Sequence, residues 1–248
     1  MERSSYDFRN SKCNFYFKNT YFELLAANGS GLGAEFVTNS IKENGEGLIG
    51  VAFGTDDIEN SYSKLKKLGY FVSDITDGEG IDKTNKKIRK WKNLFLPDEL
   101  TRGFFSFIIE HTDGILPNQE KYHEASINKL DHVVINTNDA DGFINIYKEV
   151  FNIRLALDKV IEHWKSRILF FRLNKTIIEV IERKDDKDTK DSLWGLAWEV
   201  ESIEDAHKRL LTQGVEVSSI KKGLKENTLV ATIKSHTHNV PTLLIEHI

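Results

Sequence analysis

The sequence predicts an α+β protein built from tandem βαβββ modules that form two domains. Two observations support this fold class. Strand patterns, in which apolar residues alternate, surround short helix patterns, and features of residues 50–73 recur at a constant spacing in the second half of the chain, at 195–218. The 248 residues, of which 40% are apolar and 29% charged, suffice for two domains with hydrophobic cores.

The second half of the chain contains the clearer modules. A strand is expected at 130–137, a helix at 139–151, and then three strands that end at 176–181. A loop with charges of both signs at 183–191 separates this module from the next one. The elements of that next module, in the order strand, helix and three strands, are expected at 193–200, 203–213, 215–220, 228–234 and 242–246.

The sequence pattern of the first half predicts one module that is preceded by a β-hairpin. The hairpin is expected at 13–25, and the glycine-containing segment 28–47 is interpreted as a loop. The elements expected after it are a strand at 48–53, a helix at 58–68 that Gly69 ends, a strand that starts at 70, a turn at 74–84, and strands at 88–96 and 104–111.

The internal repeat sets the domain boundaries. Gly50, Ile58 and Gly69 align with Gly195, Ile203 and Gly214 without a change of register, and the segment 109–111 (Ile-Glu-His) recurs at 245–247. We therefore expect one domain at 1–112, a linker at 113–128 and a complete domain at 129–248. The first domain lacks the strand and helix that 130–151 supply in the second.

This missing strand and helix lead to a further expectation. A sheet edge or apolar sheet face would be left uncovered in the first domain, so we expect a partner chain or a rearranged segment to cover it, giving a homodimer. The alternative is that the sequence starts later than the natural gene product.

Composition and charge exclude several classes of partner. The 34 basic and 38 acidic residues give a formal net charge of −4, which favours neither nucleic acid nor an anionic membrane surface. The apolar runs are too short for a membrane-spanning helix. The lone Cys13 cannot form an internal disulfide, and the N-terminus resembles no secretion signal, so we expect a cytoplasmic protein.

Four segments of the chain carry a resemblance to a known family. They are 130–135 (Leu-Asp-His-Val-Val-Ile), 178–180 (Ile-Glu-Val), 194–198 (Trp-Gly-Leu-Ala-Trp) and 240–246 (Val-Pro-Thr-Leu-Leu-Ile-Glu). Together they resemble the vicinal oxygen chelate superfamily, and within it the two-domain glyoxalase-like proteins. The resemblance implies paired modules that curl into a cup, and in many members a divalent metal held by residues on the first and last strands of each module. Those positions here are His132, Glu179, Gly195 and Glu246.

The resemblance implies a metal-dependent site in the second domain. His132, Glu179 and Glu246 would bind Fe, Mn, Zn or Ni and leave positions open for a substrate with adjacent oxygens. The activity would be that of a lyase, isomerase or dioxygenase, with Glu179 or Glu246 moving a proton. Gly195 departs from the family pattern because glycine supplies no donor atom. The first domain keeps Glu23, Gly50 and Glu110 at family positions.

Other interpretations of these residues stay open. His132 would then be a hydrogen-bonded core histidine, with both glutamates at strand ends in water, and the cup would bind a small molecule without a metal, as bleomycin-resistance members do. Arg172, Asn136 and Gly195 are expected to bind the small-molecule ligand, and the missing side chain of Gly195 is expected to leave space for it. For Arg172 the alternative is an ion pair with a surface carboxylate.

Overall fold

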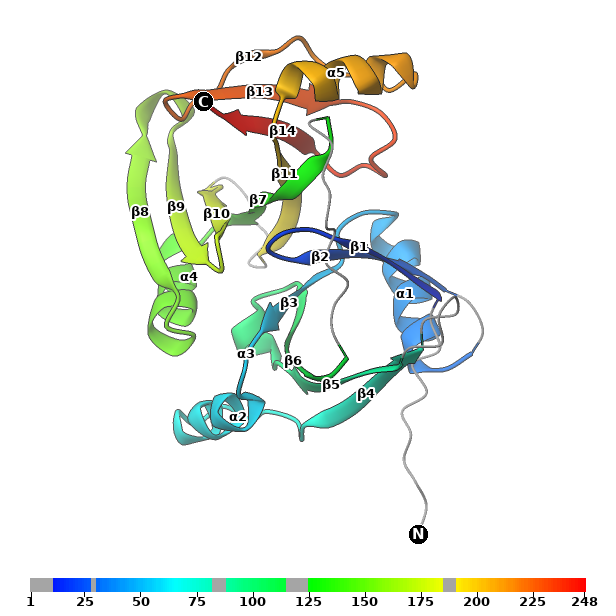
Figure 1. Cartoon of the computed structure of the whole chain (residues 1–248). Coiled ribbons are helices and arrows are strands. Elements are labelled where there is room, and N and C mark those ends of the chain that lie inside the picture. The colour runs from blue at the N-terminus through cyan, green and yellow to red at the C-terminus, as the bar shows by residue number, and fades with distance from the viewer. Residues whose placement is uncertain (1–10, 28–29, 82–87, 115–124, 185–190) are drawn as a thin grey trace.

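The computed structural model describes residues 11–27, 30–81, 88–114, 125–184 and 191–248. In these parts the strands form three sheets, one with two strands, one with four and one with eight. The larger sheets belong to different halves of the chain, and Figure 1 shows the eight-stranded sheet above the four-stranded one. The α+β fold class and the βαβββ modules predicted from the sequence are confirmed.

The eight-stranded sheet contains both modules of the second half. Its strand order is β12-β13-β14-β11-β7-β10-β9-β8, so the first strands of the two modules, β7 and β11, pair antiparallel at its centre. The last strand of each module returns parallel to the first, as β10 does to β7 and β14 to β11. The bounds are β7 Ile127–Thr137, β8 Arg154–Ile161, β9 Ser166–Leu173, β10 Thr176–Glu182, β11 Ser192–Val200, β12 Lys221–Lys222, β13 Thr228–Ile233 and β14 Thr242–His247.

The helices of these modules pack on one face of the sheet. The first module has α4 (Ala140–Ile144), which continues as the π-helix η1 (Asn145–Val150), and the second has α5 (Ile203–Thr212). Each begins at a residue whose side chain accepts a hydrogen bond from a backbone N–H of the first turn. These caps are Asp139 and Ser202, and such a cap stabilises a helix by about 1 kcal/mol. Apolar residues of the helices, including Phe143 and Ala206, join the buried core.

The first half contains a module with the same connections. Its sheet has the order β3-β6-β5-β4, with β3 parallel to β6 and α2 packed against β5 and β6. The bounds are β3 Gly50–Gly54, α2 Ile58–Lys67, β4 Thr76–Ile81, β5 Ile88–Phe95, α3 Asp98–Thr101 and β6 Phe105–Asp113.

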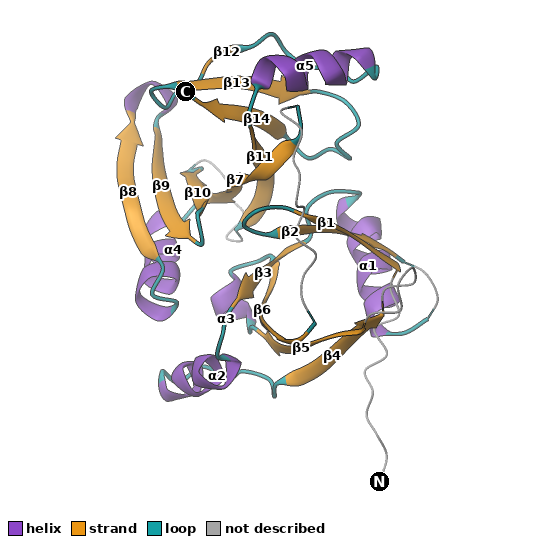
Figure 2. Ribbon diagram, in the orientation of Figure 1, coloured by secondary structure: helices purple, strands orange, loops and turns teal. Residues whose placement is uncertain are grey.

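A hairpin and a helix cover the other face of this four-stranded sheet. The hairpin consists of β1 (Ser11–Tyr16) and β2 (Tyr21–Ala26), and α1 (Leu32–Asn44) follows it. The ring of Tyr21 meets that of His111 edge-on at 5.9 Å, and Phe36 of α1 lies 4.7 Å from Phe105, ring centroid to ring centroid. Figure 2 shows the hairpin between the two larger sheets, with α1 beside it. A rearranged segment of the same chain thus lies over the face that the sequence predicts to be uncovered.

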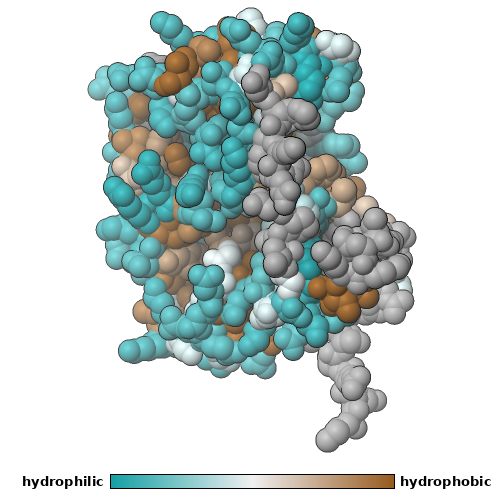
Figure 3. All heavy atoms as spheres, viewed as in Figure 1, coloured by the Kyte–Doolittle hydropathy of each residue, from teal (hydrophilic) through white to brown (hydrophobic). Residues whose placement is uncertain are grey.

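The two halves share one hydrophobic core. Phe53 of β3 packs against Tyr147 of η1 and against Phe151, the residue after η1, at centroid distances of 6.1 and 6.0 Å. The hairpin also connects the two halves, because its Phe17 and Phe22 pack against Trp198 of β11. Hydrophilic residues cover most of the face viewed in Figure 3, with hydrophobic residues exposed in separate areas between them.

Several expected elements are wrong in detail. Residues 32–44 form α1 where a loop is predicted, because apolar side chains such as Val37 are buried against neighbouring elements. Strand β4 occupies the predicted turn at 74–84, and of the strand expected at 215–220 only an isolated bridge from Val217 to Ile233 forms. Most of the predicted linker lies outside the described residues. No helix in the described parts has the length and apolar character of a membrane span.

Candidate functional site

The eight-stranded sheet has two chemically different faces. Val133, Ile135 and Val180 point to the face that carries α4, η1 and α5, and they are buried in the core. Residues that alternate with them point to the opposite face, which we call the inner face. His132 and Glu179 belong to this second set, because Glu179 lies beside Val134 in the parallel ladder of β10 and β7.

His132 and Glu179 meet on the inner face. The Nε2 atom of His132 lies 3.3 Å from Oε2 of Glu179, and only 16% and 17% of the two side chains are exposed. Burial raises the pKa of the Glu179 carboxyl; the neighbouring His132 opposes this and Asp131 adds to it. The sequence-predicted pair is therefore brought together, in surroundings that favour a protonated or cation-paired carboxyl.

A β-bulge places a second carboxylate beside His132. In the ladder between β7 and β11, His132 pairs with Ala197 and Leu130 pairs with Trp198, so Asp131 is the extra residue. Such a bulge changes the direction of the inserted side chain. Asp131 Oδ1 lies 2.8 Å from Nδ1 of His132, which fixes the orientation of the imidazole ring.

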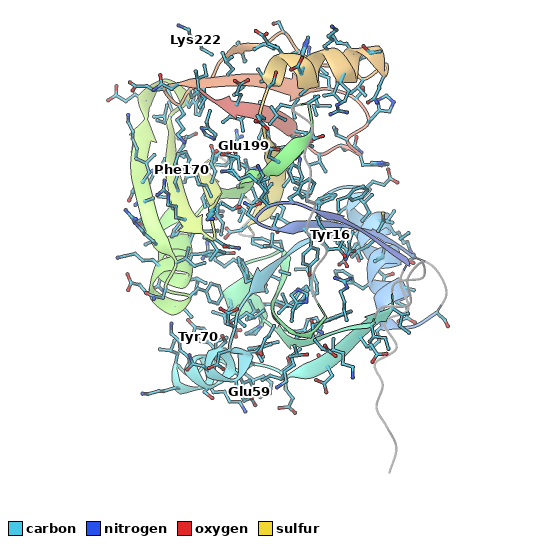
Figure 4. All side chains as sticks on the ribbon, in the orientation of Figure 1. Tyr16, Glu59, Tyr70, Phe170, Glu199 and Lys222 are labelled. Carbon is cyan, nitrogen blue, oxygen red and sulfur yellow. The ribbon has the colours of Figure 1, made fainter. Side chains whose placement is uncertain are left out.

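The contacts continue from Asp131 across two further strands. Asp131 Oδ2 lies 2.7 Å from Nε2 of His247 on β14, and the same nitrogen lies 3.5 Å from Oε2 of Glu199. Glu199 in turn pairs with Nζ of Lys129 at 2.8 Å. Figure 4 shows that Glu199 comes from β11, near the neighbouring strands β7 and β14. A chain of alternating basic and acidic side chains thus runs along the inner face from β10 to β14.

Asp131 is the central carboxylate of this chain. Burial alone would raise its pKa, but hydrogen bonds with His132 and His247 outweigh that effect and lower the pKa of Asp131 to about 2. Asp131 is therefore a carboxylate at neutral pH, and it holds both imidazoles.

Glu246 lies on the other face of the sheet. Its Oε2 accepts a hydrogen bond of 2.7 Å from the backbone N–H of Ile203, the first residue of α5. Glu110 accepts from Ile58 at the start of α2, and Glu182 from Ala140 at the start of α4, at 2.9 and 3.4 Å. The expectation that Glu246 joins His132 and Glu179 is wrong, because Glu246 is a helix-capping carboxylate repeated in three modules.

The helix caps show which residue of β14 corresponds to Glu179. If Glu246 corresponds to Glu182, the residue that corresponds to Glu179 is Leu243, which lies beside Ala197 in the ladder as Glu179 lies beside Val134. Leucine supplies no donor atom. The second module therefore contributes no metal ligand at either family position.

Gly195 has a packing role. A Cβ atom on it would lie 2.7 Å from the backbone oxygen of Pro241, so the chain approaches too closely for a side chain. Gly50 shows the same approach to the backbone oxygen of Phe105 in the first half, also 2.7 Å. Gly195 thus does not open the space for a ligand that the sequence suggests. With two protein donors in place of three or four, the family-type metal centre does not fit these residues.

The predicted ligand-binding residues Arg172 and Asn136 lie on the same face of the sheet as the His132–Glu179 pair. Arg172 of β9 is exposed and pairs with Ile177, whose other neighbour in the ladder is His132, so alternation places Arg172 on the inner face. Asn136 also alternates onto this face, and its side-chain oxygen lies 3.4 Å from Nε of Arg183. Phe170, which pairs with Glu179, supplies an apolar side chain there.

Sequence reasoning missed Asp131, Glu199, His247 and Lys129. Strict alternation along β7 would direct Asp131 away from His132, and only the bulge brings the two together. His247 was visible only as the residue after Glu246. Because Glu246 faces the helix, its neighbour faces the inner side.

Comparison with known proteins supports the assignment of the fold. Residues 7–151 match the family model described as a glyoxalase-like domain. Residues 131–232 match that of the glyoxalase/bleomycin resistance protein/dioxygenase superfamily. No curated protein compared with the chain matches it.

Solved structures with a similar arrangement cover about half of this chain. Methylmalonyl-CoA epimerase from Mycobacterium tuberculosis is 20% identical, with a TM-score of 0.44 over 52% of this chain and 94% of its own. A hypothetical protein from Bacillus halodurans is 19% identical, with a TM-score of 0.41 over 48% and 93%. The first family model alone matches more than half of the residues. The chain therefore belongs to the glyoxalase-like domain family, as a two-domain member of the vicinal oxygen chelate superfamily.

Proposed function

We propose that the inner face of the eight-stranded sheet binds a small carbonyl compound and that the His132–Glu179 pair moves a proton on it. The reaction class is that of an isomerase or lyase. The observation that carries this proposal is the approach of His132 Nε2 to Glu179 Oε2 at 3.3 Å, with Asp131 against the other ring nitrogen.

The pair contains the groups that proton transfer needs. When Nδ1–H of His132 donates to Asp131, Nε2 either accepts or shares a proton with the Glu179 carboxyl. The carboxylate of Glu179 can remove a proton from the carbon beside a carbonyl group. The C–H bond breaks, an O–H bond forms on Glu179, and the electron pair moves to the carbonyl oxygen as an enolate. Returning the proton to the carbon completes an isomerisation.

Burial gives Glu179 a suitable basicity. Because burial raises its pKa, the carboxylate is a stronger base than an exposed glutamate. Arg172 and Arg154, paired across β9 and β8, are exposed on the same face and would attract an anionic group of the substrate. The proposed substrates are therefore carbonyl compounds that carry a carboxylate or phosphate group.

The test follows hydrogen exchange directly. The purified protein is incubated in D2O with a panel of 2-substituted oxo acids and acyl thioesters, and NMR follows the loss of the proton beside the carbonyl. We expect exchange in at least one compound, slowed at least about 100-fold by Glu179→Gln. Exchange that Glu179→Gln leaves unchanged would contradict the assigned base.

A second candidate function is binding without turnover. The observation in its favour is that the second module presents Gly195 and Leu243 where the first presents His132 and Glu179. In this case compounds of the same panel would shift protein resonances while none exchanges hydrogen in the wild-type protein.

A further inference from the structure

We propose that Asp131, Glu199 and His247 form a binding site for a first-row divalent cation such as Zn2+. One donor atom from each residue lies within 4.8 Å of the other two. The donors come from the three adjacent strands β7, β11 and β14. This site differs from the family positions, because none of its three residues stands at His132, Glu179, Gly195 or Glu246.

The distances are close to those between ligands of one metal ion. The Nε2 atom of His247 lies 2.7 Å from Asp131 Oδ2 and 3.5 Å from Glu199 Oε2. Ligands at about 2.0 to 2.2 Å from a zinc ion lie roughly 3 to 3.5 Å from one another. Small side-chain movements would therefore centre an ion among the three donors.

The surroundings favour a cation that remains open to solvent. Asp131 is buried, with 10% of its side chain exposed, whereas 21% of Glu199 and 30% of His247 are exposed. Two carboxylates and one imidazole suit Zn2+ or Mn2+, and three protein ligands leave coordination positions for water. The second oxygen of Asp131 holds His132, so the ion and the His132–Glu179 pair would share this carboxylate.

Lys129 is the internal competitor for this site. Its ammonium group lies 2.8 Å from Oε2 of Glu199, the oxygen that also faces His247. A divalent cation would repel Lys129, whose side chain is 26% exposed and can turn into solvent. Removing the lysine charge should therefore strengthen metal binding, which a misfolded variant could not do.

The experiment measures Zn2+ binding to untagged, chelator-treated full-length protein by calorimetry, with Mn2+ electron paramagnetic resonance as a second probe. We expect one stoichiometric site, weakened at least about ten-fold by Glu199→Gln and by His247→Asn. Lys129→Met should bind several-fold more tightly.

Matched controls separate this site from others. Glu179→Gln and Glu246→Gln should bind Zn2+ like the wild-type protein, and circular dichroism checks that each variant is folded. The proposal is overturned if the wild-type protein shows no stoichiometric site or if His247→Asn binds equally well. It is also overturned if Glu179→Gln abolishes binding, which would place the ion at the family positions. None of these readouts depends on catalytic activity, so the result is independent of the proposed function.

Discussion

Arg102 and Asp191 form a buried ion pair that joins the two halves of the protein. The Nε and Nη2 atoms of Arg102 donate to the two oxygens of Asp191, at 2.6 and 3.3 Å, and the Asp191 side chain has no exposed surface. The backbone of Asp191 also donates to the carbonyl oxygen of Arg102. Burial raises the pKa of Asp191, and the hydrogen bonds and charge of Arg102 oppose that shift.

Replacing Arg102 by leucine should destabilise the protein strongly. The substitution leaves the Asp191 carboxylate buried without its partner, and such losses cost about 3 to 5 kcal/mol. Urea denaturation at neutral pH measures the difference. The double variant Arg102→Leu/Asp191→Leu should recover part of the loss because no lone charge remains.

The ion pair of Arg167 with Asp158 provides the control. Its two side chains are 23% and 38% exposed, so Arg167→Leu should cost no more than about 1 kcal/mol. Equal losses at Arg102 and Arg167 would show that the buried pair does not hold the halves together.

Replacing Glu246 by alanine should affect stability and leave the inner face intact. The first N–H of α5 would lose its acceptor, at a cost of roughly 1 to 2 kcal/mol. Glu110→Ala, which removes the equivalent acceptor of α2, should cost a similar amount. Thermal unfolding gives both values. If Glu246→Ala abolished hydrogen exchange in the substrate panel at unchanged stability, its assignment as a helix cap would be wrong.

Gly195→Ala should destabilise the second module. The new Cβ would meet the backbone oxygen of Pro241 at 2.7 Å, and a forced shift of this kind costs about 1 to 3 kcal/mol. Gly54→Ala is the matched control, because a Cβ there has no neighbour within 4 Å in the described parts of the chain. That variant should be neutral or slightly stabilising. The two midpoints of chemical denaturation decide the comparison.

The stability contributed by Asp131 should be lost in acid. The pKa of Asp131 falls from 3.8 in the unfolded chain to about 2 in the folded protein, so its contribution is complete above 3.8 and disappears as pH falls through about 2. The contribution is on the order of 2 kcal/mol. Asp131→Asn should flatten the stability profile over this interval in urea titrations, and an unchanged profile would contradict the prediction.

Glu179 should show the opposite dependence. Its pKa is raised from 4.5 by burial, so the protonated carboxyl favours folding, and this contribution is lost as pH rises through the raised value. In the Glu179→Gln variant, this loss of folding stability with rising pH should not occur. The same series of titrations therefore tests two carboxyl groups whose pKa shifts have opposite directions.

Regular strands made half of the candidate site predictable. Alternation along β7 and β10 puts His132 and Glu179 on one face, and the parallel ladder keeps them together. Asp131 could not be placed, because a bulge depends on the pairing of β7 with β11 and leaves no pattern in β7 alone. The helix α1 was missed because its glycine-containing start resembles a loop.

Glu246 was misassigned because two glutamates of β10 have the same sequence context as Glu246. Ile178-Glu179 and Ile181-Glu182 both resemble Ile245-Glu246, and they point to opposite faces of the sheet. The sequence alone cannot choose between them. The hydrogen bond from the first residue of α5 to Glu246 shows that Glu246 corresponds to Glu182.

The three helix-capping glutamates lie on the faces of the sheets that carry the helices, whereas the candidate ligands lie on the opposite faces. Glu110, Glu182 and Glu246 do the same work on the helix-bearing faces, while the inner positions opposite them differ between modules. A duplicated module can therefore lose its ligands and remain folded, since its helix is held from the other face. The inner-face residues of one module can therefore change and acquire a new ligand while the other module keeps its original residues. The helices of both modules stay in place.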